Sequence, residues 1–203
     1  MLKTYAWDSF VHRQLRRLQS TFPDTDIFVS VDETNGFVGT VAHDRVLRTC
    51  NADMVAMGFA NRFEKGSLIW WNADYTHYQV HDRIPDYDYY LFVEYDACIT
   101  GDGQCLLAAM MADGADFVAH PISSGPRWYW ARFHAGVYPA GRLRASLNCI
   151  SFFQPGRCLI WRAGGLPCRQ IMAQGSHSGR WGSLCGIGGG CGGPELRAAG
   201  ALW

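Results

Sequence analysis

Two carboxylates stand two residues apart directly after an apolar stretch of this sequence. The stretch is Tyr89-Tyr90-Leu91-Phe92-Val93, which is typical of a strand buried on both faces, and Glu94 and Asp96 follow it. Residues two apart on a strand project to the same side, so both carboxylates can contact one ligand while Tyr95 faces away. A hard divalent cation suits that geometry. The alternative is a pair of acids in a solvated turn, but their place after the most strand-like segment favours a function.

The composition limits the class of protein. The chain has 203 residues, enough for one domain with a core of its own, and its 18 basic and 18 acidic residues cancel. No overall field therefore favours nucleic acid or an anionic membrane surface. The sequence has no apolar run long enough for a transmembrane segment, and its start lacks the apolar core of a signal peptide. From the lack of both segments we expect a cytoplasmic protein. The eight cysteines form no CxxC pair and are interpreted as reduced core residues.

Helical and strand-like segments alternate along residues 1–154. Apolar residues at helical spacing predict a helix from Trp7 to Leu18, and a helix over 103–113 is expected to begin after Asp102 and to end at Gly114. Further segments are expected as strands at 26–31, 67–71, 89–93, 116–119 and 147–153, and as helices at 52–63 and 72–81. Residues 37–51 give no clear pattern. The alternation predicts an α/β domain with a mainly parallel sheet and helices on both faces.

An aromatic and basic stretch follows the predicted strand at 116–119. Residues 125–138 include Arg127, Trp128 and His134, and loops after parallel strands commonly form the binding site of such a fold. These side chains are candidates for holding a sugar face or another acceptor. A loop that folds onto the core remains an equal alternative.

The composition changes after Gln154. Residues 155–203 contain no Val, Phe, Tyr, Thr, Asn, Asp or Lys, and 13 of these 49 residues are glycine. No periodic segment is present there, and no complete phosphate-binding glycine motif. We expect an atypical tail with little regular structure, disordered or translated out of frame from a GC-rich gene.

Three stretches resemble the nucleotide-diphospho-sugar transferases of the type A glycosyltransferase fold. They are DIFVSVDET, WNADYTHYQVHDRIPDYDYYLFVEYDACITGD and LNCISFF, within a resemblance that covers about residues 5 to 154. The resemblance implies a Rossmann-like core in which a strand ends in a DxD-like motif that holds Mn²⁺ or Mg²⁺ and, through it, the donor diphosphate. Glu94-Tyr95-Asp96 stands at that place, with Glu replacing the first Asp. Asp96 is then the first metal ligand, and Glu94 binds the ion directly or through water.

The resemblance also gives roles to residues outside the acidic motif. It implies that Asp32 contacts the nucleoside and that Asp74 reaches the donor sugar or its ribose, while a turn-capping role for Asp32 and a helix N-terminal role for Asp74 stay open. No catalytic residue is assigned. The family's first strand is expected to be missing before the helix at Trp7, and the tail stands where an acceptor region is expected.

The leading hypothesis is a metal-dependent glycosyltransferase, or an inactive fragment of one. It would move a sugar from a nucleotide-diphosphate donor to a glycan or other hydroxyl acceptor. One alternative is a catalytically dead domain that binds a glycan or a protein. Another is a Mg²⁺-dependent phosphate hydrolase, but the sequence has neither an aspartyl nucleophile motif nor a histidine cluster to favour it.

Overall fold

The computed structural model describes residues 1–58, 75–114, 117–124, 144–154, 181–183 and 196–198. The chain divides into two compact units, of which the first comprises Met1–Asp86, Phe92–Gly103 and Glu195–Trp203. The second comprises Tyr87–Leu91 and Gln104–Pro194. The expected strand at 67–71 lies outside the described residues, as does most of the expected tail.

Four parallel strands form the sheet of the first unit. They are β1 (Leu2–Thr4), β2 (Val29–Asp32), β3 (Val46–Thr49) and β4 (Tyr90–Glu94), in the order β3-β2-β1-β4. β1 is therefore a central strand, with β2 on one side and β4 on the other. The resemblance led us to expect that no strand precedes the first helix. That prediction is wrong, because β1 precedes α1.

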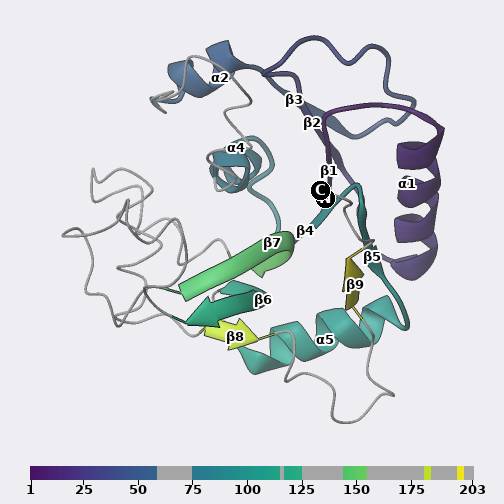
Figure 1. Ribbon diagram of the computed structural model, residues 1–203, viewed down its shortest axis with the longest axis vertical. Helices are drawn as coiled ribbons and strands as arrows, with labels where there is room; N and C mark the ends of the chain where they lie inside the picture. Colours follow the sequence, from purple (N-terminus) through teal and green to yellow (C-terminus); the bar gives the residue numbers. More distant parts are fainter. Residues whose placement is uncertain (59–74, 115–116, 125–143, 155–180, 184–195, 199–203) are drawn as a thin grey trace. The chain divides into compact units, whose positions relative to one another are not determined.

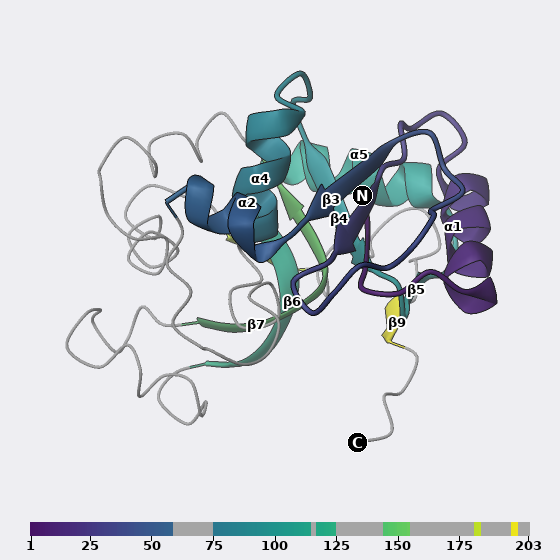
Figure 2. The ribbon, with the colours of Figure 1, turned by 90° about the horizontal axis from the view of Figure 1, so that it is seen from above.

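Helices lie on both sides of these strands (Figures 1 and 2). On one side is α1 (Ser9–Thr21), whose N-cap is Asp8. The Asp8 side chain accepts a hydrogen bond from the backbone N–H of Val11 at 2.9 Å. Apolar residues of α1 pack on apolar residues of β1 and β2 in one buried cluster of Leu2, Val11, Leu15, Val29, Val31 and Val41. The amphipathic pattern predicted for this segment is confirmed, and the helix extends three residues beyond Leu18.

On the other side lie α2 (Asn51–Ala56) and α4 (Tyr75–Arg83). Gln79 of α4 is fully buried, and its side-chain oxygen accepts a hydrogen bond from the Thr49 hydroxyl of β3. The ring of His77 meets that of Phe92 on β4 edge to face, with centroids 4.3 Å apart. These contacts hold α4 over β3 and β4, on the face opposite to α1.

The second unit has a mixed strand arrangement. Its elements are α5 (Gly103–Asp113, from Gln104 onward), β6 (Phe117–Ser124), β7 (Arg144–Phe153) and β8 (Trp181–Ser183). β6 pairs with β7 antiparallel and with β8 parallel. Tyr89 and Tyr90 stack on Phe152 and Phe153 of β7, with ring centroids 5.2 Å and 5.0 Å apart. The α/β class is confirmed, with parallel strands in the first unit and an antiparallel pair in the second.

Two short strands of the first unit complete the described elements. β5 (Ala97–Ile99) pairs antiparallel with β9 (Leu196–Ala198). β8 and β9 both fall within 155–203, where little regular structure is expected, and they are two strands of three residues each. The prediction of an atypical tail and the hypothesis about its origin both stay untested. Within the described ranges, no helix is both long and apolar enough to cross a membrane.

Candidate functional site

The carboxyl ends of β1 to β4 meet at one edge of the first unit. Backbone register pairs Lys3 with Ser30 of β2 on one side and with Glu94 of β4 on the other. Side chains alternate along a strand, so Asp32, two residues after Ser30, shares a face with Lys3 and Glu94. This is the α4 face, since Phe92 precedes Glu94 by two residues and contacts His77. A row of polar side chains thus crosses three adjacent strands close to their carboxyl ends.

Glu94 forms an ion pair with Lys3. The Lys3 ammonium donates a hydrogen bond to Glu94 Oε1 over 3.1 Å. The lysine side chain is only 10% exposed, whereas that of Glu94 is 33% exposed, so the cation is the more deeply buried partner. A buried lysine needs such a partner because an unpaired charge in this position is strongly disfavoured.

Asp96 lies in the turn that follows β4, and it is half-buried. Burial raises the pKa of the Asp96 carboxyl above its ordinary value, and the nearby Glu94 carboxylate raises it further. A hydrogen bond from its own backbone N–H and the charge of Lys3 lower the same pKa. The three charged groups are therefore within electrostatic reach of one another, and two of them are negative.

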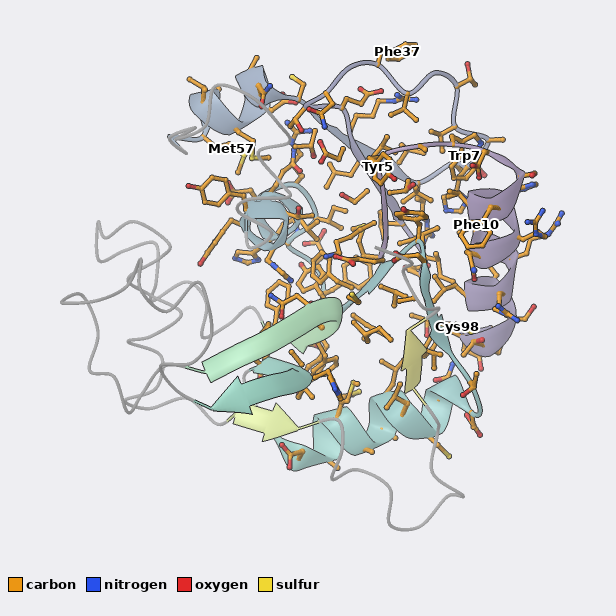
Figure 3. All side chains as sticks on the ribbon, viewed as in Figure 1. Tyr5, Trp7, Phe10, Phe37, Met57 and Cys98 are labelled. Atoms are coloured by element: carbon orange, nitrogen blue, oxygen red, sulfur yellow. The ribbon has the colours of Figure 1, made fainter. Side chains whose placement is uncertain are left out.

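Tyr95 lies against the α1 side. Its ring meets that of Tyr5 edge to face at 5.3 Å and that of Phe10 at 6.3 Å, and its hydroxyl is 3.1 Å from that of Tyr5. Trp7 and Phe10 lie where α1 meets the strands (Figure 3). The hydrogen bond to Tyr5 and burial raise the pKa of Tyr95. Aromatic contacts thus hold Tyr95 on the face opposite to Lys3. They restrain the backbone at Tyr95, and with it the positions of Glu94 and Asp96.

Asp32, at the end of β2, closes a turn. Its Oδ1 accepts hydrogen bonds from the backbone N–H of Thr34 at 2.9 Å and from the Thr34 hydroxyl at 2.5 Å. Asn51, at the start of α2, donates through its side chain to the Thr34 carbonyl at 3.0 Å. The turn-capping role that the sequence left open for Asp32 is therefore present in the structure.

The remaining residues proposed from the sequence lie outside the described residues. These are Asp74, Arg127, Trp128 and His134. Within the described part of the chain, no group of three or more histidine, cysteine, aspartate or glutamate side chains is placed to hold a metal ion. Sequence reasoning missed Lys3, because its partner Glu94 is 91 residues away and only the pairing of β1 with β4 brings the two together.

Comparisons with known proteins give structural similarities of low identity. No family model matches, and no curated protein matches. The similar solved structures include the galactosyltransferase LgtC in complex with donor and acceptor sugar analogues, at 14% identity and a TM-score of 0.48, covering 80% of this chain and 60% of that one. They also include mouse xyloside xylosyltransferase 1 in its apo form, at 11% identity and a TM-score of 0.45, covering 86% of this chain and 74% of that one.

A third similar structure is the bifunctional IspDF from Campylobacter jejuni, at 9% identity and a TM-score of 0.45. The match covers 90% of this chain and 48% of that one, so the chain spans about half the length of IspDF and 60% of LgtC. The structural neighbours thus include glycosyltransferases, the class that the sequence resembles.

Proposed function

We propose that the first unit binds a nucleotide-diphosphate sugar at the carboxyl ends of its parallel strands, with a divalent cation at Asp96, and that the sugar passes to a hydroxyl acceptor. The observation that carries this proposal is the pair of carboxylates at the end of β4, Glu94 in its last position and Asp96 two residues later, beside the buried Lys3. Ligands of open α/β sheets commonly bind beyond the carboxyl ends of the strands.

The residues present fit a divalent cation. Burial and the Glu94 carboxylate both disfavour the charged form of Asp96, and a bound cation would relieve both effects. Asp96 would hold the ion, and Glu94 would act directly or through water, since Mg²⁺ usually keeps several waters and few protein carboxylates. When bound, Mn²⁺ or Mg²⁺ would stabilise the charge that develops on the leaving diphosphate.

The other residues named from the sequence keep their proposed roles. Asp32 would orient the nucleoside through its carboxylate while it closes the turn at Thr34. Asp74 would contact the donor sugar or ribose. Arg127, Trp128 and His134 would bind the acceptor, a glycan or another hydroxyl compound, through charge and aromatic stacking.

A thermal-shift screen tests the proposal. Nucleoside diphosphates and nucleotide sugars are added to the protein with Mn²⁺, with Mg²⁺ and with a chelator. We expect at least one nucleotide to raise the midpoint of unfolding only when metal is present, because binding to the native state stabilises it by mass action. Equal shifts in metal and in chelator, or no shift with any nucleotide, would contradict a metal-dependent nucleotide site.

A second candidate function is binding of a glycan or a protein without catalysis. The ion pair between Lys3 and Glu94 favours it, because one of the two carboxylates already has a cationic partner. Hydrolysis and transfer assays with the nucleotide sugar found in the screen separate the two functions. Metal-dependent binding with release of the sugar supports a transferase, and binding of glycans without any nucleotide supports the alternative.

A further inference from the structure

At the end of β4, the Lys3 ammonium lies near two carboxylates, those of Glu94 and Asp96. Lys3 is 8% exposed and its neighbour in the register on β2, Ser30, is 3% exposed. The four-carbon stem of the lysine is therefore covered on the α4 face of the sheet, and its ammonium is fixed against Glu94 rather than extended into water. The Lys3 ammonium is therefore a fixed positive charge beside Glu94.

We propose that Lys3 is a positioning residue of the metal site: it holds the Glu94 carboxylate in an ion pair, and thereby leaves Asp96 as the one carboxylate that contacts the cation directly. This inference rests on the proposed function. Lys3 belongs to no sequence motif, and its positive charge lowers the net negative charge of the site.

The charge of the site decides how the cation would bind. With Lys3, Glu94 and Asp96 ionised, the site has one net negative charge, and Lys3 acts electrostatically on Asp96 as well as on Glu94. Repulsion between the lysine and a divalent cation weakens the affinity for the free ion. The cation would then bind well only together with the diphosphate, whose charge Lys3 attracts. By reciprocity, metal and nucleotide raise each other's affinity by the same factor.

Four proteins test the role of Lys3 by changing one charge at a time. The wild type has a net site charge of minus one, Lys3→Met has minus two, Glu94→Gln has zero, and the double variant with both changes has minus one again. The dissociation constant for Mn²⁺ alone is measured for each by the electron paramagnetic resonance signal of the free ion. Unfolding midpoints show which variants are folded.

We expect the affinity for Mn²⁺ to follow charge. Lys3→Met should bind Mn²⁺ roughly tenfold more tightly than wild type, because a unit charge near a divalent ion is worth about 1 to 2 kcal/mol even in water. Glu94→Gln should bind more weakly than wild type. The double variant should match the wild type within about twofold, since Glu94 contributes charge and not a metal bond. This comparison does not need Lys3→Met to fold, because the double variant removes the Glu94 charge together with its lysine partner.

Two outcomes overturn the proposal. If the double variant loses most of its Mn²⁺ affinity, Glu94 is a direct ligand and Lys3 does not keep it away. If Lys3→Met folds and binds Mn²⁺ no more tightly than wild type, the charge of Lys3 is not felt by the ion. Asp96→Asn separates these failures from failure of the proposed function, because Mn²⁺ binding that is unchanged in Asp96→Asn would remove the metal site itself.

Discussion

The ends of β2 and β4 present the same pattern in the sequence and are used differently in the structure. Each is an apolar strand followed by an acid at the carboxyl edge of the sheet. At the end of β2, Asp32 accepts two hydrogen bonds from Thr34 and shapes the chain locally. At the end of β4, Glu94 pairs with a lysine 91 residues away, and Asp96 has its pKa raised by burial and by Glu94. Asp32 stabilises its own turn, whichever ligand it also contacts, whereas Asp96, whose charged form burial and Glu94 both disfavour, is a candidate for binding a cation.

Gly103, which begins α5, is more tightly enclosed than the two glycines of the loop after β2. A Cβ atom added at Gly103 would lie 2.5 Å from the carbonyl oxygen of Thr21 and 2.6 Å from the ring of Phe22, at the end of α1. Added at Gly36 or Gly39, in the loop after β2, it would meet nothing within 4 Å. Gly103 is thus tightly packed against the end of α1, whereas the turn after β2 is held by the hydrogen bonds of Asp32.

The largest effect is expected for Gly103→Ala. Overpacking against the backbone of α1 should lower the free energy of unfolding by about 1 to 3 kcal/mol. Helix propensity alone predicts a gain instead. Urea unfolding measures the difference, with Ala108→Gly on an exposed part of the same helix as the control, which should lose about 1 kcal/mol through propensity. A Gly103→Ala protein as stable as wild type would show that the packing around Gly103 is loose.

Lys3→Met tests how much the ion pair with Glu94 stabilises the end of β4. The variant keeps the apolar stem and leaves Glu94 without its cation, so we expect a loss of about 2 kcal/mol in the free energy of unfolding. Adding Glu94→Gln should recover most of the loss, because it removes the unpaired charge. The two single variants and the double variant form a thermodynamic cycle in chemical denaturation. Additive losses would mean that the pair is not coupled.

Asp32→Ala addresses the other end of the comparison. The change removes the acceptor for the Thr34 N–H and should cost about 1 kcal/mol. Asp32→Asn, which keeps an acceptor oxygen, is the matched control and should retain most of the stability. If Asp32→Ala is neutral in urea unfolding, the turn does not depend on the aspartate, and the contrast with the β4 end is lost.

The smallest effect concerns Asp53, which follows β3 in the first turn of α2. Its carboxylate accepts a hydrogen bond from the Cys50 backbone N–H at 3.0 Å, and this contact is the main cause that lowers the pKa of Asp53 below 3.8, with Arg83 contributing. A lowered pKa in the folded state means that the charged form stabilises the fold. The stability of wild type over Asp53→Ala should therefore be constant above about pH 5 and fall as the pH drops below 3.8. Urea midpoints between pH 2 and pH 6 measure it, and a difference that does not change with pH would exclude this role.

Several elements were predictable because their sequences contain the whole signal. α5 spans Gly103–Asp113 as expected, and it ends at Gly114, whose φ of 63° is a conformation that glycine adopts without strain. β4 ends at Glu94, as the apolar run indicates. By contrast, β1 and β3 hold polar residues that the fold buries, Lys3 and Thr4 in one and Thr49 in the other, and their short sequences carry no alternation.

The site was predictable only in part for the same reason. The acidic pair is local, so spacing alone found Glu94 and Asp96, but it could not distinguish Asp32 as a turn acceptor from Asp32 as a ligand. Asp32 is a turn acceptor because the backbone turns so that the N–H and hydroxyl of Thr34 reach its carboxylate. The spacing of the sequence does not contain that geometry. The partner of Glu94 depends on sheet order, which puts β1 beside β4 and which short-range patterns do not contain.

The most direct test measures Asp96→Ala for stability and for nucleotide binding on the same protein. If Asp96 serves a cation site, its removal relieves repulsion with Glu94, so the variant should unfold at the same temperature as wild type or higher. The nucleotide that binds wild type only with Mn²⁺ should then show no dependence on Mn²⁺. A variant that loses about 1 to 3 kcal/mol of stability and keeps the metal dependence of wild type would contradict the account, because Asp96 would then serve the fold and not the cation.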